Sequence, residues 1–310
     1  MKRFVQRFTS SSDPMILNIE GPNLTLAGEK WTFITPRNHK NVGLRNHRIQ
    51  LIHGLPYTFC EDKEGRRYCL THRPQLDALK FAFYLMCIFP HQLNILRIRI
   101  IELDDLREVL SWDFLHKSRE LVIWDGAVSH EEMRAFLERF QTENLVICCH
   151  PGPDFVYDKR FSVNTLQIDN SSWLTRQNLL SLDCARIELN CSTLTATDIN
   201  AFLFQWLISD NNTLEYILIS GRQGGNGEPG AIYGMEGYEE LDMNEIVKGL
   251  MTYRGTRKRQ EATTYSEYYP VPYENGLDLL RHDGKLGTVL ARNNFLFVVW
   301  QHPWPFAPVV

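Results

Sequence analysis

The stretch that decides the fold runs from Asn164 to Gly221 and reads NTLQIDNSSWLTRQNLLSLDCARIELNCSTLTATDINAFLFQWLISDNNTLEYILISG. Three runs within it alternate apolar and polar residues: Thr165–Asp169, Arg186–Asn190 and Glu215–Ser220. Alternation with a period of two residues is typical of a strand with one buried face. The stretch therefore predicts three strands separated by helical segments.

The segment from Ala196 to Ser209 is predicted to be the second of these helices. Thr195 is expected to cap its N-terminus, and the carboxylate of Asp198 is expected to support its first turn. The large apolar side chains fall on a single helical face: Ile199, Phe202, Leu203, Trp206 and Leu207.

The same strand-and-helix unit recurs upstream. Strands are predicted at 96–100, 121–125 and 145–149, and a helix at 129–140 begins with the capping-box pair Ser129 and Glu132. The first inward-facing apolar residues of the six strands are Ile98, Leu121, Leu145, Leu166, Ile187 and Ile217. A strand and a short helix every ~20–29 residues is the period of leucine-rich repeats.

The polarity of the alternate strand positions separates two α/β arrangements. In a doubly wound parallel sheet, helices cover both faces and the strands become continuous apolar runs. Here the alternate positions are polar or mixed, which favours helices on one side only. The sequence therefore predicts an α/β fold with a leucine-rich-repeat-like solenoid of short parallel strands, an N-terminal β segment and a C-terminal β-meander.

The order of the elements sets the expected domain organisation. An amphipathic helix at 75–89 is expected to cap the start of the repeats, and the hairpin loop Glu61–Gly65 precedes it. An Asp283-Gly284 turn joins two of the terminal strands. The predicted parts are a remnant at 1–14 and one domain at 15–310, with a β-rich start (15–74), βα repeats (75–221), a loop-rich insert with a short helix at 243–253 (222–270) and a β-meander (271–310).

The 310-residue chain has an ordinary globular composition, with 44% hydrophobic and 23% charged residues. Its formal net charge of −4 provides no global attraction for nucleic acids or acidic membranes. No apolar run has the length of a transmembrane helix. The seven cysteines include no CxxC pair, which indicates free thiols in a reducing compartment, the cytoplasm or the nucleus.

Residues with catalytic or metal-binding potential are few, and no catalytic residue, metal ligand or cofactor is expected. Cys60, Cys69 and His72 supply only three of the four ligands of a closed zinc site. A hairpin with buried thiols is therefore favoured. A thiol hydrolase using Cys148 and His150 is the least favoured function, because adjacent strand residues point to opposite faces.

A basic cluster at 254–259, followed by Tyr265, Tyr268 and Tyr269, is the basis of an RNA-binding alternative. Positive charge and stacking rings are both used to hold RNA. No basic stripe extends the cluster over one face. A solvated loop is therefore favoured, and nucleic acid is not the expected partner.

The uncovered strand face is the remaining candidate site, because repeat solenoids bind partners on such surfaces. Arginine, tryptophan and tyrosine are the residue types enriched at binding hot spots, and all three occur on this face. The predicted partner-binding residues are Arg97, Arg99, Trp124, Gln167, Asp169, Arg186, Glu188 and Tyr216.

The segment 173–219 resembles the hallmark segment of the nematode F-box-associated domain, type 2. The tail at 276–300 is similar to the terminal strands of that family, with its Asp-Gly turn and aromatic ending. The resemblance covers most of the chain from about Ile16 onward. The residues that carry it are Trp173, Leu180, Leu182, Cys184, Ile187, Leu189, Leu194, Thr195, Asp198, Ile199, Asn200, Phe202, Leu203, Trp206, Leu214, Glu215 and Tyr216.

The resemblance implies a non-enzymatic module that selects a protein for ubiquitylation by an SCF-type cullin ligase. Members usually carry an F-box that docks on a Skp-type adaptor. Here only Lys2–Phe8 looks like the end of an F-box helix, so the resemblance does not extend to adaptor binding. The alternatives are a free-standing protein-binding scaffold without ligase coupling, the RNA-binding module at 254–269, and the thiol hydrolase.

Overall fold

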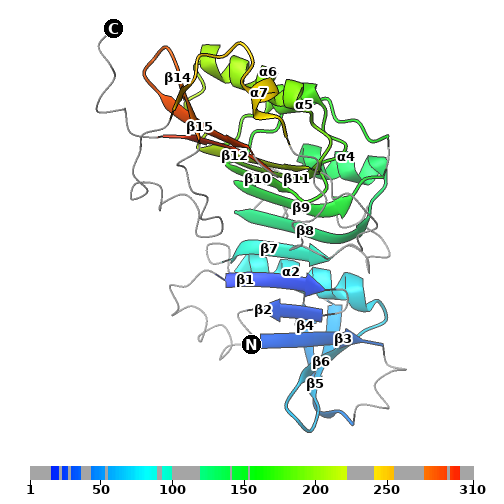
Figure 1. The fold of residues 1–310 in the computed structure, drawn as a ribbon. Helices are drawn as coiled ribbons and strands as arrows, with labels where there is room; N and C mark the ends of the chain where they lie inside the picture. Colours follow the sequence, from blue (N-terminus) through cyan, green and yellow to red (C-terminus); the bar gives the residue numbers. More distant parts are fainter. Residues whose placement is uncertain are drawn as a thin grey trace. The chain divides into compact units, whose positions relative to one another are not determined.

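The computed structural model describes residues 15–20, 23–26, 29–35, 43–52, 55–88, 93–99, 119–139, 142–152, 154–221, 241–254, 276–291 and 294–300. The chain divides into two compact units, Met1–Gly152 (unit 1) and Pro153–Val310 (unit 2). Both units combine helices with an open sheet (Figure 1). The mixed α/β class predicted from the sequence is therefore confirmed.

The first part of unit 1 is a sheet with the strand order β1-β2-β3-β6-β5-β4. All neighbours in it are antiparallel except β3 and β6, which run parallel. Strands β4 and β5 lie in the chain between β3 and β6 and form the crossover that this parallel pair requires. The strands are β1 (Met15–Glu20), β2 (Asn23–Leu26), β3 (Glu29–Ile34), β4 (Arg45–Ile52), β5 (Leu55–Glu61) and β6 (Arg67–Leu70).

The predicted hairpin joins β5 to β6. The side chain of Asp62 holds its loop, because Oδ1 accepts the backbone N–H groups of Glu64 and Arg66 at 2.9 Å each. Gly65 has φ +78°, which a side chain would strain. The following helix α2 (Pro74–Ile88) packs on the sheet through Phe81. The Phe81 ring centroid lies 5.9 Å from that of Phe33 on β3 and 5.5 Å from that of Phe59 on β5.

A parallel run completes unit 1. It consists of β7 (Leu93–Arg99), β8 (Glu120–Ala127), α4 (His130–Arg139) and β9 (Asn144–His150), and β1 pairs with β7, also in parallel. Leu96, Leu121 and Leu145 are level with one another in the register. Leu96, not Ile98, is therefore the residue of β7 that is level with Leu121 and Leu145. The predicted capping box precedes α4, where Glu132 accepts the Ser129 N–H at 2.8 Å.

Unit 2 has the strand order β13-β14-β15-β16-β12-β11-β10. Strands β10, β11 and β12 are parallel, and the antiparallel meander β14-β15-β16 joins them through β16 and β12. The predicted meander is thus confirmed. The elements are β10 (Thr165–Ile168), α5 (Arg176–Ser181), β11 (Arg186–Ser192), α6 (Ala196–Ile208), β12 (Tyr216–Gly221), α7 (Met243–Ile246), β13 (Tyr253–Arg254), β14 (Leu277–Leu280), β15 (Leu286–Ala291) and β16 (Asn294–Val299).

Helix α6 covers one face of this sheet. The predicted cap is present, with Asp198 Oδ2 accepting the Thr195 N–H at 2.9 Å. The Trp206 and Phe297 rings meet edge to face with their centroids 4.8 Å apart. Gly287 makes room for this contact, because a Cβ there would lie 2.3 Å from the Phe297 ring.

Helix α7 is shorter than predicted from the sequence and ends at Ile246. The Asn200 side chain on α6 donates to the Ile246 carbonyl at 2.6 Å and to the Lys248 carbonyl at 3.1 Å. These bonds satisfy carbonyl groups at the helix end. The chain turns there and enters β13. No described helix is long and apolar enough to cross a membrane.

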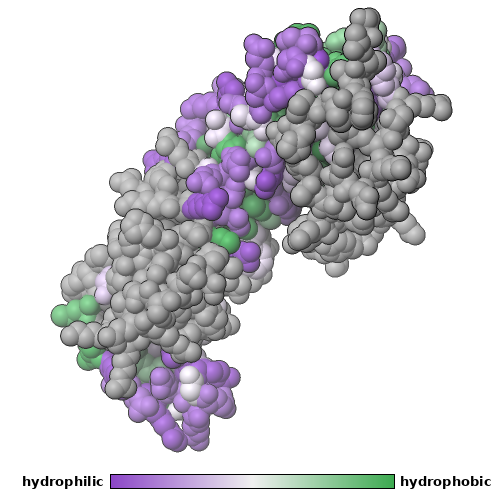
Figure 2. Space-filling view, turned by 90° about the vertical axis from the view of Figure 1, so that its left-hand side faces the viewer, coloured by the Kyte–Doolittle hydropathy of each residue, from purple (hydrophilic) through white to green (hydrophobic). Residues whose placement is uncertain are grey.

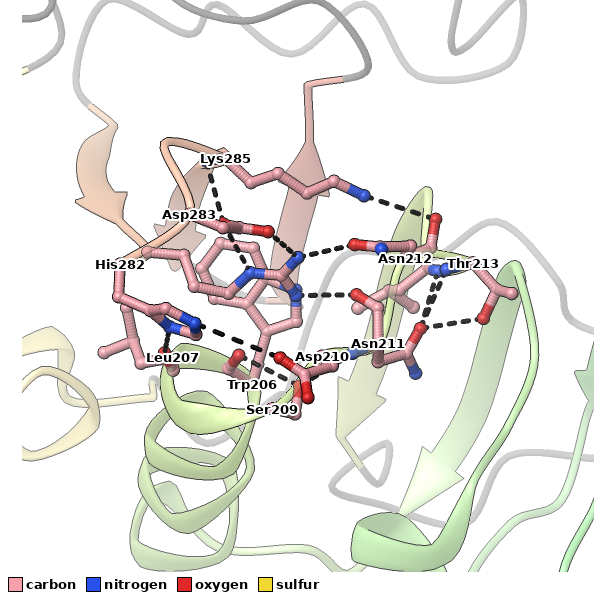
Figure 3. A network of polar contacts seen from close by, with 12 residues as sticks. Trp206, Leu207, Ser209, Asp210, Asn211, Asn212, Thr213, His282, Asp283 and Lys285 are labelled. Atoms are coloured by element: carbon pink, nitrogen blue, oxygen red, sulfur yellow. Dashed lines mark hydrogen bonds and ion pairs between the residues drawn. The ribbon is translucent and has the colours of Figure 1, made fainter.

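Arg281 is the largest fully buried side chain of the described core and directly follows β14. Figure 3 shows the residues around it, among them Trp206, Asn211 and Asp283. Its guanidinium donates to the Asn211 carbonyl at 2.6 Å, to Asn212 Oδ1 at 2.7 Å and to both carboxylate oxygens of Asp283 at 2.9 and 2.5 Å. The Trp206 ring centroid lies 5.2 Å from its Cζ. One buried cation therefore joins the β14–β15 turn to α6 and to the loop that precedes β12.

Replacing Arg281 by methionine should destabilise the protein strongly. The substitution keeps an apolar stem but removes the charged donor that Asn211, Asn212 and Asp283 share, and these partners are themselves half-buried or exposed. Hydrogen bonds to a charged group contribute about 1.5–3 kcal/mol of unfolding free energy, so a loss of that size is expected. Urea unfolding followed by circular dichroism measures the loss. Lys285→Met in the same turn is the control and should cost less than about 1 kcal/mol. Equal losses in the two variants would contradict a special contribution of the Arg281 guanidinium to stability.

The stability that Arg281 and Asp283 contribute should also depend on pH. The hydrogen bonds from Arg281 hold the pKa of the Asp283 carboxyl well below its ordinary value. A carboxyl with a depressed pKa in the folded state stabilises above its unfolded pKa of about 3.9, and this contribution is lost as pH falls towards the folded value. The stability gap between wild type and Asp283→Asn should therefore narrow below about pH 4. A gap that stays constant in urea unfolding across that range would refute this.

Candidate functional site

The strand face of unit 2 that points away from α5 and α6 carries most of the predicted site. On the helix side, Leu166, Ile187 and Ile217 are level in the register and at most 1% exposed. Residues on alternate positions of a strand point to opposite faces. The predicted residues Gln167, Asp169, Arg186, Glu188 and Tyr216 occupy the alternate positions. The structure therefore brings these five side chains to one face.

The register sets which of them are neighbours. Gln167 on β10 is level with Glu188 on β11, and Arg186 on β11 is level with Tyr216 on β12. Arg186 is exposed, and the other four side chains are half-buried. A partner could therefore contact these side chains from solvent, and neighbouring atoms already restrict the four that are half-buried.

Hydrogen bonds hold these side chains in place. The Tyr216 hydroxyl donates to Glu188 Oε1 at 2.7 Å, and Arg186 Nε donates to Glu215 Oε2 at 2.7 Å. We refer to Gln167, Asp169, Arg186, Glu188, Asn190, Glu215 and Tyr216 as the polar strand face.

Asn190 and Glu215 were not predicted as site residues. Asp169 Oδ1 accepts from Gln167 Nε2 and from Asn190 Nδ2, both at 3.2 Å. Asn190 continues the alternation of Arg186 and Glu188, so the sequence pattern could have identified it. Glu215 lies one residue before β12, and only the three-dimensional pairing with Arg186 shows its role.

Three carboxylates and one guanidinium give the polar strand face an excess of negative charge: Asp169, Glu188 and Glu215 against Arg186. Burial raises the pKa of the Tyr216 hydroxyl well above its ordinary range, and the hydrogen bond to Glu188 raises it further. Tyr216 therefore stays protonated near neutral pH and acts as a donor. This arrangement suits recognition by hydrogen bonds and charge.

Unit 1 presents the other three predicted site residues on a strand face of its own. Arg97 is exposed on β7, and Trp124 is half-buried on β8. The backbone of Arg99 is level with Trp124; its side chain lies outside the described residues. All three occupy positions opposite to the buried Leu121 and Ile123.

The structure separates the cysteines that were considered for zinc. Cys60 is level with Tyr68 and Cys69 with Phe59, so the two thiols point to opposite faces of the hairpin. Both are buried, as the hairpin interpretation predicts, and His72 is exposed. Among the described residues, no group of three or more histidine, cysteine and acidic side chains could hold a metal ion.

Cys148 and His150 lie on the same face of β9, which corrects the expectation that they point to opposite faces. Cys149 and His150 are adjacent on β9 and point to opposite faces, whereas Cys148 and His150 are two residues apart and share a face. Cys148 is half-buried and His150 is exposed. The RNA-binding alternative concerns 254–269, of which only the backbone of Arg254 lies within the described residues.

The space-filling view shows a surface whose described part is mostly hydrophilic, with hydrophobic residues in small separate patches (Figure 2). Among the residues that the structure describes, the exposed large apolar side chains are Ile49, Leu51, Val156, Phe204, Ile208, Met251 and Tyr253. Fold and surface together define a mixed α/β protein whose open strand faces carry fixed polar side chains.

Residues 159–219 match the family described as F-box associated. The family resemblance predicted from the sequence is therefore confirmed over these residues, which we refer to as the F-box-associated segment. It contains the whole polar strand face, from Gln167 to Tyr216, together with α5 and α6. No solved structure matches the chain.

Curated relatives come from Caenorhabditis elegans. The uncharacterized protein F59B2.8 is 23% identical over 240 residues, 74% of this chain and 51% of that protein. The uncharacterized protein F59B2.9 is 23% identical over 171 residues, 51% of this chain and 36% of that protein. The E3 ubiquitin-protein ligase hecw-1 is 31% identical over 66 residues, 21% of this chain and 5% of that protein. The chain thus spans about half the length of the first of these relatives.

The thiols provide a test of the chemistry at β9. Burial raises the pKa of Cys149 to about 12 and that of Cys184 to about 11. Because the thiolate is the reactive form, Cys149 should alkylate about a thousandfold more slowly than an unperturbed thiol near neutral pH. Cys148 should react at a rate similar to that of the half-buried Cys191. Iodoacetamide labelling followed by peptide mass spectrometry measures each rate. Stoichiometric labelling of Cys148, far ahead of Cys191, would instead support an activated nucleophile.

Proposed function

We propose that this chain is a non-enzymatic protein-interaction module that selects a protein for ubiquitylation. The observation that carries the proposal is the polar strand face, which lies wholly within the F-box-associated segment 159–219. Three parallel strands present side chains from one face, where a flat or extended partner can reach several of them together.

The hydrogen bonds within the face support a binding role. Side chains that are ordered before binding lose less conformational entropy when a partner arrives. Tyr216 and Arg186 belong to the residue types that dominate binding energy at interfaces. Both are held by neighbouring carboxylates, at 2.7 Å in each case, so they meet the partner in defined orientations.

The leucine-rich-repeat-like architecture is part of this proposal. In each parallel run, a strand is followed by a return segment, and in unit 2 the helices α5 and α6 lie on one side of the sheet (Figure 1). Repeat proteins of this kind use the strand surface for partners. By the same reasoning, Arg97, Arg99 and Trp124 form a partner-binding surface of unit 1.

The ubiquitin-ligase context rests on the family and on a relative. The matched family is described as F-box associated, and one relative is named as an E3 ubiquitin-protein ligase. In this proposal the chain binds the protein to be modified, in the cytoplasm or the nucleus, while other subunits catalyse ubiquitin transfer. A Skp-type adaptor would be contacted through an F-box, not through the polar strand face.

Disrupting the polar strand face should weaken substrate selection. We would fuse an F-box before Met15, assemble the fusion with a Skp-type adaptor and a cullin ligase, and supply tagged ubiquitin and a Caenorhabditis elegans extract. The double variant Arg186→Glu/Tyr216→Ala should reduce ubiquitylation of the selected proteins at least about fivefold, as expected for losing more than about 1 kcal/mol of binding. Mass spectrometry quantifies the modified proteins.

Arg176→Glu is the matched control, because Arg176 is exposed on α5, on the helix side of the same sheet. It should leave the set of modified proteins unchanged. If the face variant and the wild type modify the same set of proteins, the polar strand face is not the recognition surface. If wild type modifies nothing beyond the F-box alone but still retains partners that the face variant loses, the chain is a scaffold without ligase coupling.

A further inference from the structure

Strand β4 forms an open edge of the unit 1 sheet. It is the last strand in the order and pairs with β5 on one side only. Among the described strands none pairs with its other side, so that row of backbone N–H and C=O groups is available to an added strand. β4 spans 8 residues, whereas a typical strand has about five or six and edge strands are usually kept short.

Two aliphatic side chains project from β4 into solvent. Ile49 is 71% exposed and Leu51 is 72% exposed. They are two residues apart and are level with Thr58 and Pro56 on β5, so they share one face of the strand. A strand added to the edge would place its own side chains directly beside them.

Basic side chains occupy the first half of the same strand. Arg45, His47 and Arg48 are exposed, and within the described part of the chain none of them makes an ion pair. The register of the β4–β5 pairing shifts between Arg45 and Arg48, and Asn46, which lies between them, has φ +55°. As a result Arg45 is level with Glu61 and Arg48 with Phe59.

This shift decides the direction in which the arginines point. Glu61 and Phe59 are two residues apart on β5 and share a face. Arg45 and Arg48 therefore share that face too, while Ile49 and Leu51 point to the opposite one. The edge thus displays positive charge on one face and aliphatic surface on the other.

We propose that the edge of β4 binds an extended acidic–aliphatic segment of a partner protein as an added strand. Main-chain hydrogen bonds provide the affinity in this mode of recognition, and alternate side chains provide the specificity. Carboxylates on one face of the incoming segment meet Arg45 and Arg48, and aliphatic side chains on its other face lie beside Ile49 and Leu51. A second copy of β4 fits less well, because its sequence RNHRIQLI contains no carboxylate.

This surface is independent of the polar strand face, so a different probe tests it. The probe is a short labelled peptide in which glutamate and valine alternate, titrated with the full chain and followed by fluorescence anisotropy. Saturable binding is expected, with hydrogen-exchange protection concentrated in β4. A peptide in which lysine replaces each glutamate should bind at least about tenfold more weakly, because like charges then face each other.

Variants of β4 locate the binding. The double variant Ile49→Thr/Leu51→Thr should bind the peptide at least about threefold more weakly than the wild type. Arg48→Glu should also weaken peptide binding at least about threefold. Ile208→Thr and Arg176→Glu, at exposed positions of unit 2, should bind as wild type does. The wild type and the four variants can be compared by thermal unfolding, so that a loss of binding is separated from a loss of fold.

Four outcomes would overturn the proposal. The first is the absence of saturable binding to the folded wild-type chain at millimolar peptide. The second is equal affinity for the glutamate and lysine peptides, and the third is equal affinity of the β4 variants and the unit 2 controls. The fourth is self-association of the wild-type chain in sedimentation that Ile49→Thr/Leu51→Thr abolishes, which would make a second copy of the chain the occupant.

Discussion

The geometry of unit 2 depends on the contacts that the buried guanidinium of Arg281 makes. A charge removed from water is tolerated only when its donors are paired. Here Asp283 neutralises it, Asn211 and Asn212 each accept one further hydrogen bond from it, and Trp206 covers its plane. These partners come from a strand turn, a helix and a loop (Figure 3). Their positions are therefore coupled, and none can shift alone without leaving a buried charge unpaired.

That coupling extends to the polar strand face. Asn211 and Asn212 belong to the loop that leads to Glu215 and Tyr216, and the Glu215 N–H bonds to the Ala185 carbonyl at 2.7 Å. The loop is stiffened by Asn211 Oδ1, which accepts the Thr213 N–H at 2.8 Å. Arg281 thereby sets where β12 begins beside β11, and hence where Tyr216 meets Glu188. We interpret the polar strand face as a recognition surface that is organised in advance by a buried cation.

Local patterns predicted much of this fold, and long-range pairings did not follow from them. Alternation located β10, β11 and β12, and the Thr195–Asp198 spacing located the start of α6, because both depend only on nearby residues. The parallel pair β3–β6, the register of Leu96 and the early end of α7 at Ile246 depend on residues far away in sequence. The same limit applied to the site: alternation identified Glu188 and Tyr216, whereas the roles of Glu215 and Arg281 needed the folded arrangement.

The most direct test of the central claim is photo-crosslinking from the two sides of the unit 2 sheet. A photoreactive phenylalanine would replace Gln167 on the polar strand face or Arg176 on α5, and each protein would be irradiated in a Caenorhabditis elegans extract. The account predicts discrete crosslinked partners from position 167 that excess unlabelled wild-type chain competes away, and none of these partners from position 176. Crosslinks to the same partners from position 176, with none from position 167, would contradict it.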